Sequence, residues 1–514
     1  MVKTLIRNIV SNWLGFAVRA GVVFFLTPFV IHSLGDTRYG IWALIMAITS
    51  QFGLLDLGFR KGVTVYLTRH LAATDFVQLN SMASSAFSFL VCCGAIVGLA
   101  SVGVAWVLPY AFTVPLESVV ESRWCIGIIG IGSAIQFPTF VFSSVLWAKQ
   151  RYDLDNFINV PIQLASAAAT VLVLDLEYGL IGLCAVTVSS DLVGTLIRWR
   201  TAYSILPQLN ISLGLREWSN VRAMAGFGLW TFIISRFVQL KSSGAILIIG
   251  AFMPISALTP YNLALGLITY YSQLFNMTAG VFFPAATQLE ARGDTQALRK
   301  MYLLGSRMVI LLAMTAAVIG AVWAEDFFRL WVGSRFLSGE PYPSVALLFW
   351  LLISAAFVAT AQTTGIQILL GSRKPRPLVI IAVAEALASL GVCIALVTPF
   401  GLVGIALGLL VPTIVFQGLI TPYVICRSLG IPVKVYASTV WMRPCVVGAL
   451  SAGTLILLRH VLPSSSSWAD LFVSGALAGV GVAVLIIVVG LDASERNRFV
   501  FQPLNTVWLQ FASK

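Results

Sequence analysis

The chain has 514 residues, of which 59% are hydrophobic and only 10% are charged, and its mean hydropathy is +0.93. Soluble globular domains carry about 25% charged residues, so this composition excludes a water-soluble fold and indicates an integral membrane protein. The net charge is +12. Nucleic-acid binding is not predicted, because the basic residues fall in short loops between apolar runs, as topology signals do.

The seven cysteines and three histidines are scattered within or beside the apolar runs. They show no metal-ligand spacing, and buried cysteines in such segments usually act as small apolar packing residues. We therefore predict no metal site, no disulfide and no cofactor.

The first apolar run follows two basic residues, Lys3 and Arg7, as the run of a signal peptide would. It is too long for a signal peptide, contains Arg19 and lacks an obvious cleavage site with small residues. We interpret it as a retained first membrane helix.

Apolar runs of membrane-spanning length recur along the whole chain. At about 20 apolar residues per helix, fourteen spans are predicted, joined by short turns because lipid-exposed loops do not occur at membrane depth. The spans lie near residues 10–34, 39–68, 81–108, 124–148, 156–175, 178–205, 224–252, 256–289, 300–324, 342–371, 376–398, 401–426, 442–461 and 468–491.

The distribution of Lys and Arg between loops predicts the orientation. If the N-terminus is cytoplasmic, most basic loop residues fall on the cytoplasmic side. The opposite loops then hold only five of them, namely Arg38, Arg123, Arg329, Arg335 and Arg459. We expect a multi-pass protein of the cell (inner) membrane with both termini in the cytoplasm.

Polar and glycine residues recur at an offset of 222 residues, which places Lys241 opposite Arg19 and Gly401 opposite Gly179. The offset predicts two six-span repeats, which insert in the same direction because six is an even number. The predicted organisation is a six-helix N-terminal lobe (1–205), a cytoplasmic connector (206–222), a six-helix C-terminal lobe (223–430), and two extra helices with a cytoplasmic tail (431–514).

Basic side chains occur at membrane depth, where a charge facing lipid costs at least about 2.5 kcal/mol. They are therefore expected to line a water-filled cavity, although Arg60, Lys61 and Arg307 could also reach the headgroups. A net basic cavity suits an anionic ligand, and guanidinium groups suit phosphate because their donors form a planar fork. The candidate substrate-binding residues are Arg19, Arg60, Lys61, Arg236 and Lys241.

Three acidic residues are also predicted at membrane depth: Asp56, Asp191 and Glu385. Asp56 precedes Arg60 by four residues, a spacing that permits a salt bridge on one helix face. Each of the three acids is either a partner in a structural ion pair or a protonatable coupling residue, and the sequence does not choose between these roles.

A series of short motifs follows a fixed order through the first twelve predicted spans. The series comprises Tyr39-Gly40-Ile41-Trp42, Leu54-Leu55-Asp56-Leu57-Gly58, Gln150-Arg151-Tyr152-Asp153, Phe227-Gly228-Leu229-Trp230, Pro260-Tyr261-Asn262-Leu263-Ala264, Pro284-Ala285, Glu290-Ala291-Arg292-Gly293-Asp294, Leu330-Trp331-Val332-Gly333 and Phe400-Gly401-Leu402-Val403-Gly404. In this order the chain resembles the oligosaccharide flippase (polysaccharide transporter) family. That family belongs to the superfamily that includes the multidrug and toxin extrusion (MATE) proteins.

The resemblance implies two MATE-like six-helix lobes around a central cavity. It also implies alternating-access transport of a polyprenyl-diphosphate-linked oligosaccharide to the outer leaflet, for surface polysaccharides such as O-antigen or lipopolysaccharide. Expected partners are this substrate, membrane lipids, and a polysaccharide polymerase or glycosyltransferase. The deep cations that match the family's cationic cavity are Arg19, Arg60, Arg236 and Lys241. The chain departs from two-fold symmetry because Phe282-Phe283 stands at the position equivalent to Arg60-Lys61.

Two alternatives remain. A cation-coupled multidrug antiporter of the same fold would require an acidic cavity, whereas the predicted one is basic. A membrane glycosyltransferase or polymerase would need acid/base chemistry on a soluble face, but the longest outer loops, 109–123 and 325–342, are short. The chain also lacks a glycine-rich phosphate loop of the ATP-binding kind. The sequence therefore favours a transporter over an enzyme.

Overall fold

The computed structural model describes the backbone of residues 2–56, 59–372, 375–461 and 467–497. Within these ranges the chain is helical and contains no strand. The predicted all-α membrane fold is confirmed. Contacts divide the chain into two compact units, residues 1–259 and residues 260–514, called here the N-terminal and C-terminal units.

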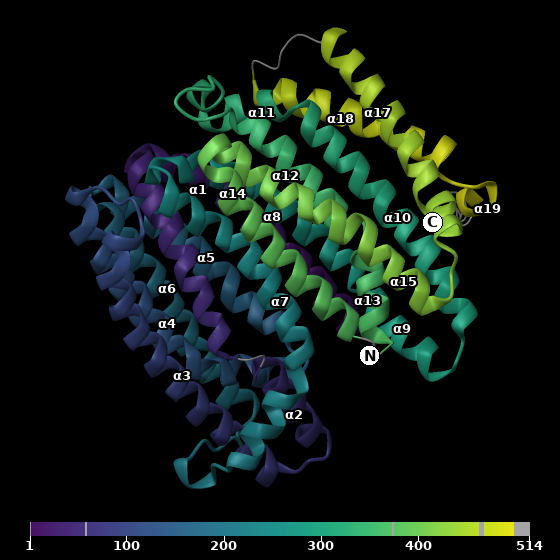
Figure 1. Ribbon diagram of the computed structural model, residues 1–514. Coiled ribbons are helices and arrows are strands. Elements are labelled where there is room, and N and C mark those ends of the chain that lie inside the picture. The colour runs from purple at the N-terminus through teal and green to yellow at the C-terminus, as the bar shows by residue number, and fades with distance from the viewer. Residues whose placement is uncertain (1, 57–58, 373–374, 462–466, 498–514) are drawn as a thin grey trace, which may run out of the picture. The chain divides into compact units, whose positions relative to one another are not determined.

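Among its described residues the N-terminal unit contains seven α-helices, and a 3-10 turn, η1, follows the first of them (Figure 1). These elements are α1 (Val2–Ser50), η1 (Gln51–Asp56), α2 (Phe59–Ala72), α3 (Phe76–Ala111), α4 (Val119–Ala148), α5 (Tyr152–Asp175), α6 (Gly179–Ile205) and α7 (Trp218–Phe252).

The C-terminal unit continues from α8 and ends with a short helix before the C-terminus. Its helices are α8 (Leu258–Ala279), α9 (Phe282–Ala291), α10 (Thr295–Val322), α11 (Ala324–Val332), α12 (Val345–Thr360), α13 (Thr363–Gly371), α14 (Arg376–Thr413), α15 (Thr421–Leu429), α16 (Val433–Tyr436), α17 (Met442–Val461), α18 (Trp468–Leu485) and α19 (Ala493–Arg496).

Eleven helices of the described chain are long and apolar enough to cross a membrane, so the count of fourteen spans is not confirmed. Two pairs of predicted spans each run together into one continuous helical stretch, which explains part of the difference. The first pair is joined across Gly35 in α1, and the eleventh and twelfth spans are joined across Gly401 in α14. The eighth predicted span is divided between α8 and α9 and is not among the eleven.

The repeat seen in the sequence also appears in the backbone. Gly179 begins α6 with a φ of +58°, and Gly401, 222 residues later, interrupts α14 with a φ of +56°. Glycine adopts this left-handed conformation without the steric strain of a Cβ atom. The two glycines thus share a positive φ, as the predicted repeat would require.

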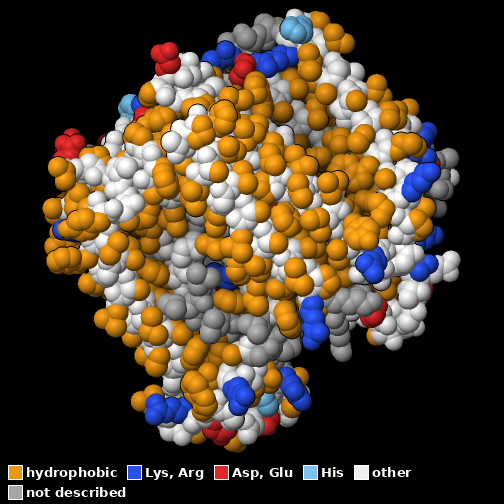
Figure 2. Space-filling view, in the orientation of Figure 1, with side chains coloured by type: hydrophobic (Ala, Val, Ile, Leu, Met, Phe, Trp, Pro, Cys, Tyr) orange, Lys and Arg blue, Asp and Glu red, His pale blue; other side chains and the backbone are white. Residues whose placement is uncertain are grey.

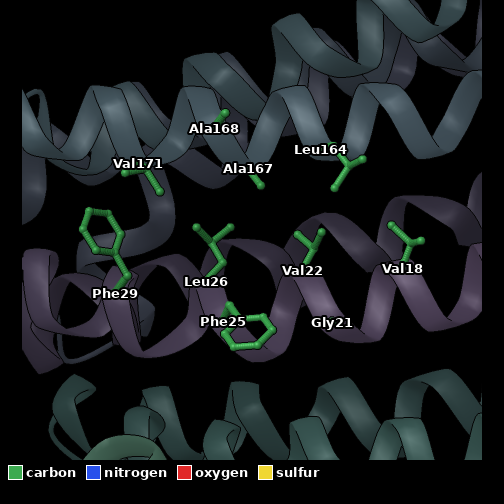
Figure 3. A pocket seen from close by; sticks show the side chains of 10 residues that line it. All are labelled: Val18, Gly21, Val22, Phe25, Leu26, Phe29, Leu164, Ala167, Ala168 and Val171. Atoms are coloured by element: carbon green, nitrogen blue, oxygen red, sulfur yellow. The ribbon is translucent and has the colours of Figure 1, made fainter.

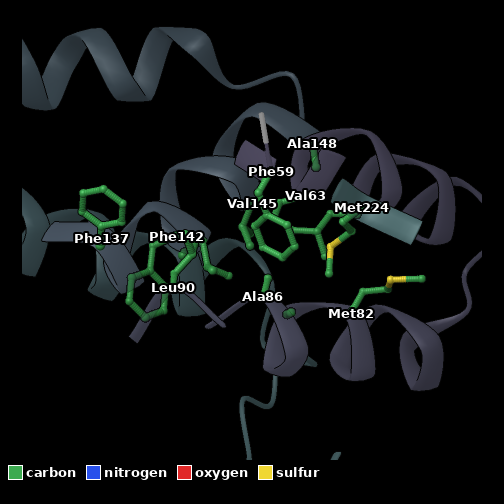
Figure 4. Close-up of a cluster of buried hydrophobic side chains, with 14 of the residues drawn as sticks. Phe59, Val63, Met82, Ala86, Leu90, Phe137, Phe142, Val145, Ala148 and Met224 are labelled. Carbon is green, nitrogen blue, oxygen red and sulfur yellow. The ribbon is translucent and has the colours of Figure 1, made fainter. Parts of the chain in front are cut away.

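A cluster of buried hydrophobic side chains in the N-terminal unit joins α2, α3, α4 and α7 (Figure 4). Phe59 of α2 is fully buried and lies among side chains that include Leu90 of α3, Val145 of α4 and Met224 of α7. Such close packing holds helices together inside a bilayer, where lipid tails are as apolar as the helices themselves. The cluster packs α2 and α7 against α3 and α4.

Helix α7 packs against α1, α2 and α3 within the N-terminal unit, although its sequence belongs to the second repeat. A Cβ atom at Gly62 of α2 would overlap the backbone carbonyl of Met224, so the two helices touch through their backbones. In sequence, the boundary between the two contact units therefore follows Thr259, whereas the boundary between the predicted lobes falls in the connector 206–222. The lobe boundaries themselves stay a prediction.

Hydrophobic side chains cover most of the face shown in Figure 2, and charged side chains gather mainly toward its edges. This distribution is the one expected of a surface in contact with lipid, because a charge facing the bilayer interior is costly. It agrees with the multi-pass membrane assignment.

Ion pairs fasten the two C-terminal helices to the rest of their unit. At one end of α17, Arg459 donates to Glu325 at 2.8 Å. At the other end, Arg443 pairs with Asp492, and Arg307 of α10 pairs with both Asp492 and Glu495. Arg307 is therefore buried among acids, which differs from the free headgroup contact considered from its sequence position.

Changing Glu495 to Gln is expected to lower the free energy of unfolding by about 2 kcal/mol, because a buried charged group loses one of its charge-assisted hydrogen bonds. Thermal unfolding of the purified protein in detergent measures the change. Glu325→Gln, at the more exposed pair, is the control and should shift stability by less than about 1 kcal/mol. Equal effects of the two substitutions would contradict the role of Glu495 as a partner of the buried Arg307.

Candidate functional site: a group of cations on three packed helices

All five predicted substrate-binding cations lie in the N-terminal unit, on helices α1, α2 and α7. Helix α7 contacts both of the other two. Arg19 and Lys241, which occupy equivalent repeat positions, therefore stand on neighbouring helices. The packing gathers onto one group of helices residues that are more than 200 positions apart in sequence.

These three helices are strongly basic. Helices α2 and α7 contain no acidic residue, and α1 contains one, Asp36. Because opposite charges are so scarce along them, the helices present a net positive potential that favours anions.

Arg19 lies on α1 with an exposed side chain. It makes no ion pair or hydrogen bond with any residue whose side chain the structure describes. A cation at the predicted membrane depth that has no partner among the described side chains requires water or an anionic ligand to lower its cost. Arg19 is the candidate whose surroundings leave it most available to a ligand.

Arg60 is held by aromatic rings. Its guanidinium carbon lies 5.0 Å from the ring centroid of Phe137 and 4.7 Å from that of Phe140, both on α4. Cation–π contacts of this kind contribute about 0.5–2 kcal/mol, depending on how far the cation is desolvated. They orient the half-buried Arg60 side chain toward α4, so the structure gives it a packing role in addition to its charge.

Arg236 lies over the turn that follows α1. Its guanidinium occupies the space that a Cβ atom at Gly53 would need, and it lies 5.5 Å from the Phe232 ring. Nearby on the same helix, Gln239 donates to Ser243 at 2.9 Å, and Ser243 is 3.0 Å from Ser50 of α1. A glycine at position 53 is therefore what allows the cation to approach the chain at the end of α1.

Ser50, Gln239 and Ser243 were not among the residues predicted from the sequence. A signal for two of them was available, because 236, 239 and 243 follow the spacing of one helix face. These polar side chains extend the cationic group with neutral hydrogen-bonding groups at the α1–α7 contact.

Lys241 is half-buried on α7, five residues beyond Arg236. Five residues correspond to a rotation of about 140° around an α-helix, so the two cations do not share one face. The side chains of Lys61 and Asp56 lie outside the described part of the structure. The predicted Asp56–Arg60 salt bridge therefore stays a prediction.

The two other predicted acids lie on other helices, Asp191 on α6 and Glu385 on α14. Asp191 of α6 is within hydrogen-bonding reach of Gln136 and near Arg198. Arg198 also pairs with Asp155 at 3.0 Å. Glu385, in the C-terminal unit, is buried and accepts hydrogen bonds from Thr413 at 3.1 Å and Gln417 at 2.6 Å.

The helical fold is that of a multi-pass membrane protein. A model of the family described as "Polysaccharide biosynthesis protein" matches residues 34–341, which is more than half of the chain. The chain belongs to this family. It is also similar to a protein of Bacillus subtilis (strain 168) described as "Uncharacterized membrane protein EpsK", with 21% identity over 95% of this chain and 96% of that one.

Solved structures with similar folds include transporters of two kinds. The lipid II flippase MurJ in an inward closed conformation matches with a TM-score of 0.71 and 11% identity, over 95% of this chain and 99% of that one. An inward-facing multidrug resistance MATE transporter matches with a TM-score of 0.66 and 13% identity, over 80% and 95% of the two chains. At these identities the likeness shows the fold alone, and the predicted MATE-like fold is confirmed.

Proposed function

We propose that this protein moves a polyprenyl-diphosphate-linked oligosaccharide from the cytoplasmic to the outer leaflet of the cell membrane by alternating access. The observation that carries the proposal is the set of five cations on α1, α2 and α7, three neighbouring helices that contain a single acid. A diphosphate is the part of such a substrate that a cationic site would recognise. The protein acts in this proposal as a transporter and not as an enzyme.

The chemistry of the arginine side chains fits a diphosphate headgroup. Guanidinium groups hold phosphate through parallel N–H donors and stay charged even when partly desolvated. Arg19 offers an exposed guanidinium, and Arg236 offers one beside the hydroxyl groups of Ser50 and Ser243. These hydroxyls supply further hydrogen bonds for phosphate or sugar oxygens.

The comparisons support the proposal in two ways. The family to which the chain belongs is described as "Polysaccharide biosynthesis protein", which supports a role in that process. One protein of the same fold is described as a flippase for lipid II. From these descriptions and the positive-inside rule we infer cytoplasmic termini, an inner-membrane location, and work alongside a polysaccharide polymerase or glycosyltransferase.

The alternative is a cation-coupled multidrug antiporter, since MATE transporters share the fold. The scarcity of acids on α1, α2 and α7 disfavours a cationic cargo. One similar fold, a transporter from Pyrococcus furiosus with 14% identity and a TM-score of 0.59, is described as having a binding pocket of reverse polarity that suggests a different function. The charge of the binding pocket is therefore the property that distinguishes the proposed flippase from a multidrug antiporter.

The membrane potential should drive the proposed transport. Outward movement of one negative charge from a negative interior gains about 2.3 kcal/mol per 100 mV, so a diphosphate with about two charges gains about twice that. In sealed vesicles, an imposed interior-negative potential is expected to accelerate outward flipping of a fluorescent polyprenyl diphosphate sugar.

The potential is imposed with an ionophore and an ion gradient. Vesicles that contain the ionophore but have no ion gradient provide the control. Equal flipping rates with and without the potential would contradict electrogenic transport and would require a counter-ion to move with the lipid. An absence of flipping under both conditions, with a cationic dye transported instead, would contradict the flippase proposal.

A further inference from the structure

An open apolar groove runs between α1 and α5 in the N-terminal unit (Figure 3). It has a volume of about 600 Å³ and is lined by residues that include Val18, Gly21, Phe25 and Phe29 of α1 and Leu164 and Val171 of α5. From Val18 to Phe29 it follows α1 for about 16 Å. None of the residues that line it is polar or charged, so the groove suits a hydrocarbon chain.

The groove ends close to Arg19, an exposed cation of α1. Arg19 follows the lining residue Val18, and helical side chains lean toward the N-terminus of their helix. We therefore expect the Arg19 guanidinium beyond the Val18 end of the groove. Near this end α1 also contacts α5, because a Cβ atom at Gly15 would collide with the side chain of Asn156.

A cation followed by an apolar groove matches the order of groups in an anionic lipid, a charged headgroup followed by a hydrocarbon chain. We propose that the α1–α5 groove holds the polyprenyl chain of the transported lipid while Arg19 binds its diphosphate. The inference rests on the proposed function and extends it, since it assigns a site to the hydrocarbon part of the substrate.

The bilayer competes with the groove for the chain. Because lipid tails are as apolar as the groove, binding there gains only close van der Waals contacts and little hydrophobic free energy. The groove should therefore add modestly to affinity, by roughly fivefold. Weak binding of the chain beside strong binding of the headgroup lets the chain exchange with the bilayer as the protein changes conformation.

Gly21 offers a direct way to fill the groove. A Cβ atom at this position would meet no other atom within 4 Å, so a leucine side chain can enter the groove without a clash with the helices. Gly103 on α3 is the matched control, because it is exposed and its Cβ atom would also meet open space. Replacing either glycine with leucine also raises helix propensity, so neither variant is expected to unfold.

The experiment measures binding of two ligands to protein in nanodiscs. One ligand is a long-chain polyprenyl diphosphate and the other is geranyl diphosphate, whose chain is too short to follow the groove. Gly21→Leu should weaken binding of the long ligand by roughly fivefold and leave that of the short ligand unchanged. Gly103→Leu should change neither affinity.

The outcomes separate the groove from the proposed function. If Gly21→Leu leaves the ratio of the two affinities unchanged while the wild type binds both, the groove assignment is wrong and the flippase proposal stands. If the wild type binds neither diphosphate, the proposed function fails and the groove assignment with it.

A photo-cross-linking experiment gives a second readout that does not depend on a variant. A diazirine on the polyprenyl chain should label peptides from both α1 and α5, and excess phosphatidylglycerol should not suppress the labelling. Suppression by phosphatidylglycerol would show that an ordinary phospholipid occupies the groove, and labelling confined to other helices would overturn the assignment.

Discussion

Replacing both Arg19 and Lys241 with glutamine is expected to weaken binding of a polyprenyl diphosphate by at least about 100-fold. A charge-assisted hydrogen bond contributes about 1.5–3 kcal/mol, and each 1.4 kcal/mol changes affinity tenfold. The two residues lie on the packed helices α1 and α7. Titration of the purified variants in nanodiscs, at a fixed ionic strength, measures the effect.

Arg123→Gln is the matched control for this prediction, because it also removes one positive charge per substitution. Arg123 lies on α4, donates to the carbonyl of Ala105 at 3.2 Å and stacks near the ring of Trp106. It should leave diphosphate binding within about twofold of the wild type, since only long-range charge is lost. If the Arg123 variant weakens binding as much as the double variant, overall charge and not a specific site attracts the ligand.

The second large effect is expected at the contact between α2 and α7. Gly62→Val should lower stability by about 3 kcal/mol, because the new side chain would overlap the Met224 carbonyl and a backbone cannot move aside as a side chain can. Thermal unfolding in detergent measures the loss. Separation of the two helices would also displace Arg60 and Arg236, so diphosphate binding should fall together with stability.

Gly103→Val tests whether the effect comes from the contact or from valine in a membrane helix. Beyond Gly103 there is open space, so only the small difference in helix propensity remains, and its stability should change by less than about 1 kcal/mol. A Gly62→Val protein as stable as the Gly103→Val protein would contradict the close approach of α2 and α7.

The fold was predictable because its main signals are local. Apolar runs of membrane length lie where the helices are found, and the recurrence of glycine at 179 and 401 identified a turn that the backbone repeats. The number of spans was less accessible. A kink at a single glycine, as at Gly35, leaves helical hydrogen bonding on both sides. A count of spans from hydropathy and a count of continuous helices therefore differ.

The site was predictable only in part. A charge in an apolar run identifies a costly residue, and this signal selected Arg19, Arg60 and Arg236 as candidates from the sequence alone. It could not show that Arg60 stacks on two rings of α4 or that Arg236 rests on Gly53, because those contacts join distant segments. The same limit applies to Arg307, whose acidic partners are more than 180 positions later in the sequence.

Ligand charge tests the account's central claim most directly. Protein in nanodiscs would be titrated with a polyprenyl diphosphate sugar and, separately, with a cationic dye of the kind that multidrug transporters carry. The account predicts tight, salt-sensitive binding of the diphosphate and weak binding of the dye, because α1, α2 and α7 bear five cations predicted at membrane depth and only one acid. Preferential binding of the dye would contradict it and favour the antiporter.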